Sequence, residues 1–128
     1  MKTKKVSVSG FGRLSAFCHA VIAGDFIYVS GTLGTKSGSM ELVEGGTEAE
    51  TAQALQNISL ILKECGAALS DLVKVSVFLA DIQTFSEMNE AYLEVMVVDP
   101  PACITVGRAE LARVAAVEID AVAYKTHA

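Results

Sequence analysis

The sequence predicts an α/β (α+β) fold in which two helices cover one face of a mixed β-sheet. The first observation is the order of segments, which is a strand hairpin, a helix, a strand, a second helix and two final strands. Strand–helix–strand connections normally join parallel strands, whereas a hairpin joins antiparallel ones. The second observation is that no internal repeat or linker-like stretch interrupts the chain, so residues 1–128 are expected to form a single domain.

The first two strands are predicted over Phe17–Ala23 and Phe26–Leu33, which are rich in Val, Ile, Phe and Tyr. Gly24 and Asp25 separate them, and this pair is typical of a tight hairpin because glycine tolerates a positive φ. No apolar run follows the basic segment Met1–Lys5, so that segment is expected to be a solvated tail.

A glycine-rich stretch, residues 34–46, predicts a loop that can hold a short edge strand at 40–43. A helix follows, with Thr47 and Glu50 spaced as a capping box and Gly66 at its C-terminal end. Its buried stripe is expected to contain Thr51, Ala54, Leu55, Ile58, Ile61, Leu62 and Cys65. Cys65 is therefore interpreted as a core residue.

Residues 72–79 alternate as a strand, with Val73, Val75, Val77 and Leu79 on one face. A second capping box, Thr84 with Glu87, predicts a helix whose apolar face carries Phe85, Met88, Tyr92 and Val95. The run Asp99-Pro100-Pro101 ends this helix, because proline disfavours helical backbone in the residue before it. The last two strands are predicted at about 103–107 and 114–124.

The composition favours self-association. The chain is 52% hydrophobic and 20% charged, and both helices are expected on one face of the sheet, so the other face needs a cover. A net charge of -5 argues against a broad nucleic-acid surface. No apolar run approaches the length of a membrane span, so no membrane partner is expected.

Cysteine and histidine usage gives two further expectations. Three cysteines without CxxC spacing, and no signal peptide, indicate a reducing, cytoplasmic location. His19 and His127 have no metal-ligand partners at useful spacing, and adjacent Cys18 and His19 would point to opposite faces of a strand. No metal site is predicted.

The chain resembles the Rid family (YjgF-like, reactive intermediate deaminases) from about Phe11 to Tyr124. The resemblance lies in the blocks 17–21, 23–31, 53–58, 73–79, 88–92, 101–102 and 117–123. It implies a chorismate-mutase-like subunit in a homotrimer, with a small-molecule cleft between subunits.

The resemblance also implies an activity, the hydrolysis of 2-imino and enamine acids to 2-keto acids and ammonia without a cofactor. This is the 2-iminobutanoate/2-iminopropanoate deaminase reaction. Glu118 matches the glutamate that orients or activates the attacking water. The matching substrate-binding positions are Ser30, Gly31, Asn89, Tyr92 and Thr105.

The pocket positions depart from the family pattern. Cys103 stands where the family has a carboxylate-binding arginine, and a thiol offers no charged, two-pronged donor. Phe17 stands in the place of a tyrosine. Arg13 is the candidate replacement cation, whereas Arg108 and Arg113 are expected on the surface.

Other interpretations stay open. Glu118 and Asp120 share a strand face and can be an ordinary solvated surface, and Tyr92 can be core. The alternative function is a catalytically inactive trimer that binds a small molecule or a partner. A third hypothesis is that Cys103 is a nucleophilic or redox-sensitive thiol. The competing interpretation is that Cys103 is a small apolar residue that fills the space of the family's arginine.

Overall fold

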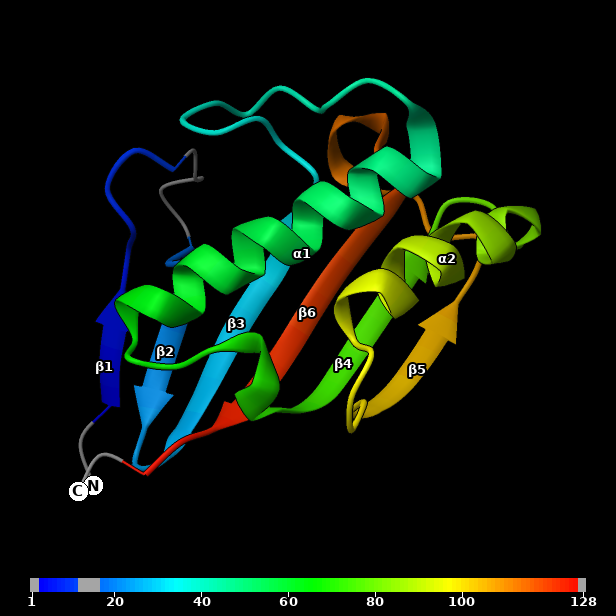
Figure 1. Cartoon of the computed structure of the whole chain (residues 1–128). Coiled ribbons are helices and arrows are strands. Elements are labelled where there is room, and N and C mark those ends of the chain that lie inside the picture. Colours follow the sequence, from blue (N-terminus) through cyan, green and yellow to red (C-terminus); the bar gives the residue numbers. More distant parts are fainter. Residues whose placement is uncertain (1–2, 12–16, 127–128) are drawn as a thin grey trace.

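The computed structural model describes residues 3–11 and 17–126, in which two helices lie across one face of a six-stranded mixed sheet (Figure 1). The helices are α1 (Gly46–Glu64) and α2 (Phe85–Val95). The strands are β1 (Thr3–Val6), β2 (Ala20–Ala23), β3 (Phe26–Leu33), β4 (Leu72–Leu79), β5 (Ala102–Val106) and β6 (Val117–Tyr124). Single 3₁₀ turns lie at Leu69–Asp71, Ile82–Thr84 and Ala112–Val114. The predicted fold class is confirmed.

The strand order, β1-β2-β3-β6-β4-β5, corrects one expectation. The final strand β6 lies between β3 and β4 and pairs antiparallel with both. Among the described strands, β4 and β5 therefore form the sole parallel pair, where two were predicted. Residue patterns define strands but carry no information on which strand inserts between two others.

The segment expected to be a solvated tail is in fact the edge strand β1, which pairs antiparallel with β2. Lys4 and Lys5 are exposed on this strand, so the sequence lacks the apolar alternation that normally predicts one. Lysines are common on edge strands because they discourage pairing with other molecules. β2 is shorter than predicted and begins at Ala20.

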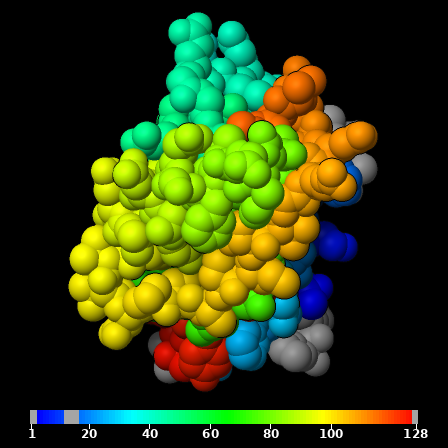
Figure 2. Space-filling model, turned by 90° about the vertical axis from the view of Figure 1, so that its right-hand side faces the viewer, coloured from blue at the N-terminus to red at the C-terminus, as the bar shows by residue number. Residues whose placement is uncertain are grey.

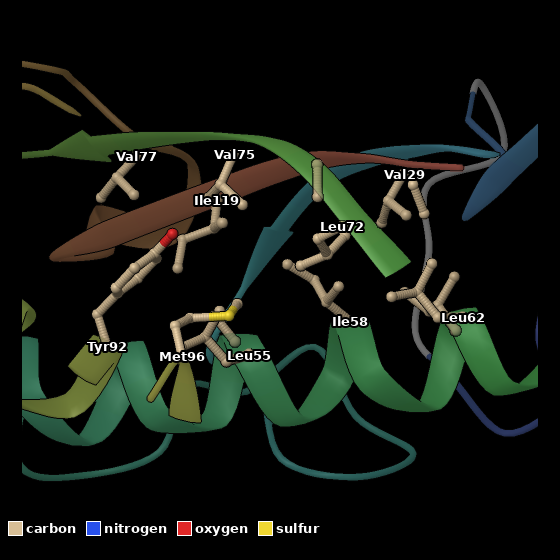
Figure 3. Close-up of a cluster of buried hydrophobic side chains, with 14 of the residues drawn as sticks. Val29, Leu55, Ile58, Leu62, Leu72, Val75, Val77, Tyr92, Met96 and Ile119 are labelled. Atoms are coloured by element: carbon tan, nitrogen blue, oxygen red, sulfur yellow. The ribbon is translucent and has the colours of Figure 1, made fainter. Parts of the chain in front are cut away.

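The hydrophobic core lies between α1, α2 and the sheet (Figure 3). All seven residues of the predicted α1 stripe are buried, including Cys65. The α1 C-terminus ends as predicted at Gly66, whose φ is 77°. The Gly66 N–H donates to Lys63 O at 3.1 Å and the Ala67 N–H to Leu62 O at 2.9 Å, which satisfies the last carbonyl groups.

Both predicted capping boxes are wrong. Gly45, with φ 118°, occupies the α1 N-cap position, and the buried Glu50 side chain instead accepts a hydrogen bond from Ala116 N at 2.9 Å. At α2, the Thr84 hydroxyl donates to Asp81 O at 2.7 Å and caps nothing. Glu50 is bound by a residue 66 positions away and Thr84 by the backbone of its own turn, and residue spacing reveals neither contact.

Two apolar faces also differ in detail. The β4 register shifts between Leu72 and Lys74, so Leu72 enters the core and Val73 is 44% exposed. On α2 the buried residues are Met88, Ala91 and Tyr92, whereas Phe85 and Val95 are exposed. Finally, β6 begins at Val117 instead of Val114, because the turn at 112–114 precedes it.

The sheet face opposite the helices carries apolar side chains. Ladder register places Phe26, Tyr28 and Tyr124 together on it, and all three are at least 40% exposed. The rings of Phe26 and Tyr124 meet edge to face at 5.1 Å. At one end of the molecule, the β5–β6 connection (orange) stands beside the loop that precedes α1 (cyan) in Figures 1 and 2.

Candidate functional site

A cavity of about 680 Å³ lies where β3 separates from β2. The two strands pair as far as Val29, and beyond it the segment 17–19 runs beside β3. Between Val29 and Thr32 the register of β3 against β6 shifts. Four of the sequence-predicted site residues line this cavity: Phe17, Ser30, Gly31 and Glu118. Residues far apart in the sequence are thus brought to one hollow by a bulge in β3.

Glu118 is the acidic group of this cavity. It is half-buried near the start of β6, directly against Gly31, where a β-carbon would lie 2.9 Å from the carboxylate oxygen Oε2. Burial, followed by the negative charge of Asp120, raises the pKa of Glu118. A carboxylate with a raised pKa in a cavity is suited to exchange a proton with a reactant or a water.

The bulge beside Glu118 is held by hydroxyl groups. The Ser30 hydroxyl donates to Cys18 O at 2.7 Å, and the Thr32 hydroxyl donates to Ser30 O at 2.8 Å. The Ser30 N–H donates to His19 O at 3.0 Å. Ser30 therefore fixes the segment that carries Phe17 and Cys18 against β3, and its oxygen still has accepting capacity toward a ligand.

The lining residues that were not predicted as site residues include three with defined contacts. His19 is buried, and its Nδ1 accepts a hydrogen bond from Val8 N at 2.7 Å. Phe11 meets the His19 ring edge to face at 5.6 Å. Asn57, buried on α1, donates to Leu33 O at 3.1 Å and Thr35 O at 3.0 Å. The polar Asn57 within the apolar stripe of a helix was the one sequence feature that could have indicated a buried polar site residue.

In the described part of the chain, Arg113 is the one arginine or lysine that lines the cavity. It is exposed, as predicted, but its place in the cavity lining was not foreseen. The backbone at Arg113 and Val114 is left-handed, with φ of 62° and 54°. Arg13, the cation that the sequence analysis favoured, lies outside the described residues.

A second group of predicted residues lies elsewhere. Cys103 is opposite Val75 in the parallel ladder, and Val75 is buried under the helices, so Cys103 lies on the helix-covered face. Its thiol donates to Ile104 O at 3.6 Å and lies 3.8 Å from Thr105 Oγ1. Glu118 lies on the opposite face, with β4 between the two strands.

Tyr92 belongs to the Cys103 group. Its ring is buried in the core, as the alternative interpretation expected, and its hydroxyl makes no hydrogen bond (Figure 3). Burial, and after it the nearby Cys103 thiol, raises the pKa of Tyr92 to about 12. Asn89 is half-buried on α2 and does not line the cavity. A single chain therefore divides the predicted site between the two faces of its sheet.

The described residues contain no group of three or more His, Cys, Asp or Glu side chains that could hold a metal ion. All three cysteines are free, and Cys103 is exposed. His19 lies beside β2 and is separated from Cys103 on β5 by three strands. Within one subunit His19 therefore cannot act as the base for this thiol. No described helix combines the length and apolar composition needed to cross a bilayer.

Comparison with known proteins places the chain among relatives. The family model described as Endoribonuclease L-PSP matches residues 10–125. A RutC family protein from Pyrococcus abyssi is 36% identical over 112 residues, which cover 88% of each chain. The 2-iminobutanoate/2-iminopropanoate deaminase of Homo sapiens is 38% identical over 112 residues, 88% of this chain and 82% of that protein. The crystal structure of RidA from an Antarctic Psychrobacter superimposes with a TM-score of 0.84 at 32% identity and covers 94% of each chain.

Proposed function

Because the chain belongs to the Endoribonuclease L-PSP family, to which the RutC and Rid proteins belong, we propose that it hydrolyses a small 2-imino acid to a 2-keto acid and ammonia. The single observation that carries the proposal is the Glu118 carboxylate in the cavity, half-buried against Gly31 and with a raised pKa. The activity for which the human relative is named, at 38% identity, supports it.

The chemistry asks little of the protein, because an imine carbon is already electrophilic. Ionised Glu118 accepts a proton from a water as the water oxygen bonds to that carbon, and the C=N π electrons pass to nitrogen, which takes up a proton. The resulting carbinolamine then loses ammonia as the C–N bond breaks and a C=O bond forms. One water is consumed, and no cofactor takes part.

The working assembly is proposed to be a homotrimer with a cleft between subunits. The apolar face that carries Phe26, Tyr28 and Tyr124 supplies a surface for a second copy of the chain. The separation of Cys103 and Glu118 within one subunit is also consistent with a site that two subunits share. Three free cysteines support a cytoplasmic location.

The second candidate function is a non-catalytic trimer that binds a neutral or aromatic metabolite. Cys103 favours it, because a thiol lacks the fixed positive charge of the guanidinium that the Rid resemblance leads one to expect at this position. A binder of this kind should be stabilised against heat by such a ligand and should show no imino-acid turnover.

The decisive assay follows pyruvate release from 2-aminoacrylate that a pyridoxal-phosphate-dependent dehydratase generates in situ. The wild-type chain should accelerate pyruvate release above the buffer rate, and Glu118→Gln should abolish the acceleration. Glu64→Gln, which removes an exposed carboxylate at the far end of α1, is the matched control and should keep full activity. A wild-type rate equal to buffer, with Cys103→Arg gaining none, would reject the hydrolase in favour of the binder.

A further inference from the structure

We propose that Arg113 binds the substrate carboxylate in this cavity and so supplies the cation that position 103 lacks. The inference rests on the proposed function, because it assigns the carboxylate end of the same 2-imino acid. Arg113 and Glu118 line one cavity, together with Ser30 and Phe17. An arginine suits the task because its planar guanidinium donates two parallel hydrogen bonds to a carboxylate.

The guanidinium is available for a ligand. In the described residues the sole ion pair joins Lys36 to Glu41 at 3.5 Å, and Arg113 forms none. Glu41 and Arg113 also border a second hollow of about 530 Å³, but Glu41 already has its lysine partner. Among the described residues that line the cavity, Arg113 is the sole arginine or lysine, and it is therefore the group to which an anionic ligand is drawn.

The backbone that carries Arg113 is unusual. Arg113 and Val114 are both left-handed, and this conformation is rare for a β-branched residue such as Val114. Burial of the valine does not compensate, because its side chain is 95% exposed. Backbone strain of this kind clusters at ligand sites, where it fixes the direction of a side chain.

Contacts on either side hold the strained turn in place. The Val114 N–H donates to Leu111 O at 3.2 Å, and the Ala115 N–H donates to Ala112 O at 3.2 Å. The next N–H, that of Ala116, donates to the buried Glu50 side chain on α1. The turn that carries Arg113 is therefore tied to α1 by the hydrogen bond between Ala116 and Glu50.

The arrangement of the two charges matches the substrate. No ion pair joins Arg113 to Glu118, so the two groups stand apart in the cavity. In a 2-imino acid the carboxylate is bonded directly to the electrophilic carbon. A carboxylate held by Arg113 leaves that carbon facing the water activated by Glu118. Phe11, Phe17 and Met40 line the cavity as well, so the favoured substrates carry an apolar side chain.

The test measures binding of 2-oxobutanoate, the stable keto-acid product, and of its neutral amide by calorimetry. Arg113→Gln should weaken 2-oxobutanoate binding by about 10- to 100-fold and leave amide binding unchanged. Arg108→Gln is the matched control, since Arg108 lies in the same connection with the same left-handed backbone but does not line the cavity. It should change both affinities less than about twofold. Arg113→Lys, which keeps the charge but loses the fork, should fall between wild type and Arg113→Gln.

Equal effects of Arg113→Gln and Arg108→Gln, or no 2-oxobutanoate binding by the wild-type chain, would overturn the proposal. Failure of the hydrolase proposal gives a different result. In that case, Arg113-dependent binding of the keto acid persists without imine turnover. Conversely, full imine turnover by Arg113→Gln rejects the carboxylate role and leaves the hydrolase intact. Circular dichroism of each variant confirms that the fold is kept.

Discussion

Glu118 rests on Gly31, and the absence of a side chain at position 31 gives the carboxylate its place. A β-carbon there would approach Oε2 to 2.9 Å and Cδ to 3.0 Å. The φ of Gly31 is not positive, so alanine suits its backbone and changes only the contact with Glu118. Gly31→Ala should therefore displace the carboxylate and lower imine hydrolysis by about tenfold or more.

The control for this variant is a double-mutant cycle measured by chemical denaturation. In the wild-type background Gly31→Ala should destabilise the fold by about 1 kcal/mol through overpacking. In the Glu118→Ala background the same change should cost little, because the colliding atoms are gone. Equal costs in both backgrounds would show that the two residues do not interact.

Asp120 should set the pH range of catalysis. Its charge is one of the two causes that raise the pKa of Glu118, after burial. The base form of Glu118 is the ionised one, so hydrolysis should increase as pH rises through the pKa of this residue. Asp120→Asn removes the repulsion and should shift the acidic limb of the pH–rate profile to lower pH. An unchanged limb would mean that Asp120 does not act on Glu118.

Tyr92 should make the fold sensitive to alkali. Its pKa is raised to about 12, above the ordinary value of 10, so the folded state favours the protonated phenol. The stability associated with that proton is complete below the ordinary value and is lost as pH rises from 10 toward about 12. The Tyr92→Phe variant cannot ionise at this position, so it should lose less stability than wild type over this interval. Thermal unfolding of both proteins at several pH values measures the difference.

At neutral pH, Tyr92→Phe should be as stable as wild type or more stable by about 1 kcal/mol, because the buried hydroxyl has no hydrogen-bond partner. Loss of several kcal/mol in Tyr92→Phe at neutral pH would reveal a hydrogen bond to this hydroxyl in the protein.

The apolar sheet face predicts self-association, and the proposed assembly is a trimer. Light scattering after size-exclusion chromatography should give three times the mass of one chain. Tyr28→Lys places a charge on that face and should yield monomers. Leu60→Lys, at a 39% exposed position of α1, should leave the mass unchanged. A wild-type monomer would exclude the trimer.

Much of the fold was predictable from the sequence because local periodicity reports burial. The α1 stripe, the Gly24–Asp25 turn and the Gly66 terminus each depend on neighbours within a few residues, and the structure confirms them. The capping boxes failed for the opposite reason. Glu50 is bound by Ala116, 66 residues away, and no local spacing encodes that contact.

The site shows the same division. The family motifs in the sequence assigned Glu118, Ser30, Gly31 and Phe17 to the site, and all four line one cavity. They also grouped Cys103 and Tyr92 with these residues, although the structure places that pair on the other face of the sheet within a subunit. Arg113 was expected on the surface, and a sequence does not reveal which cavity an exposed side chain lines.

By itself the sequence determined the fold class, most of the elements and, through its family motifs, the acidic group of the site, since burial period and motif residues are local features. The tertiary structure alone decided that β6 inserts between β3 and β4, which sets Glu118 beside Gly31 and away from Cys103. It also decided that a strained turn carries Arg113 to the same cavity. Contacts between segments distant in the sequence fix these relationships, and such contacts form only when the whole sheet assembles.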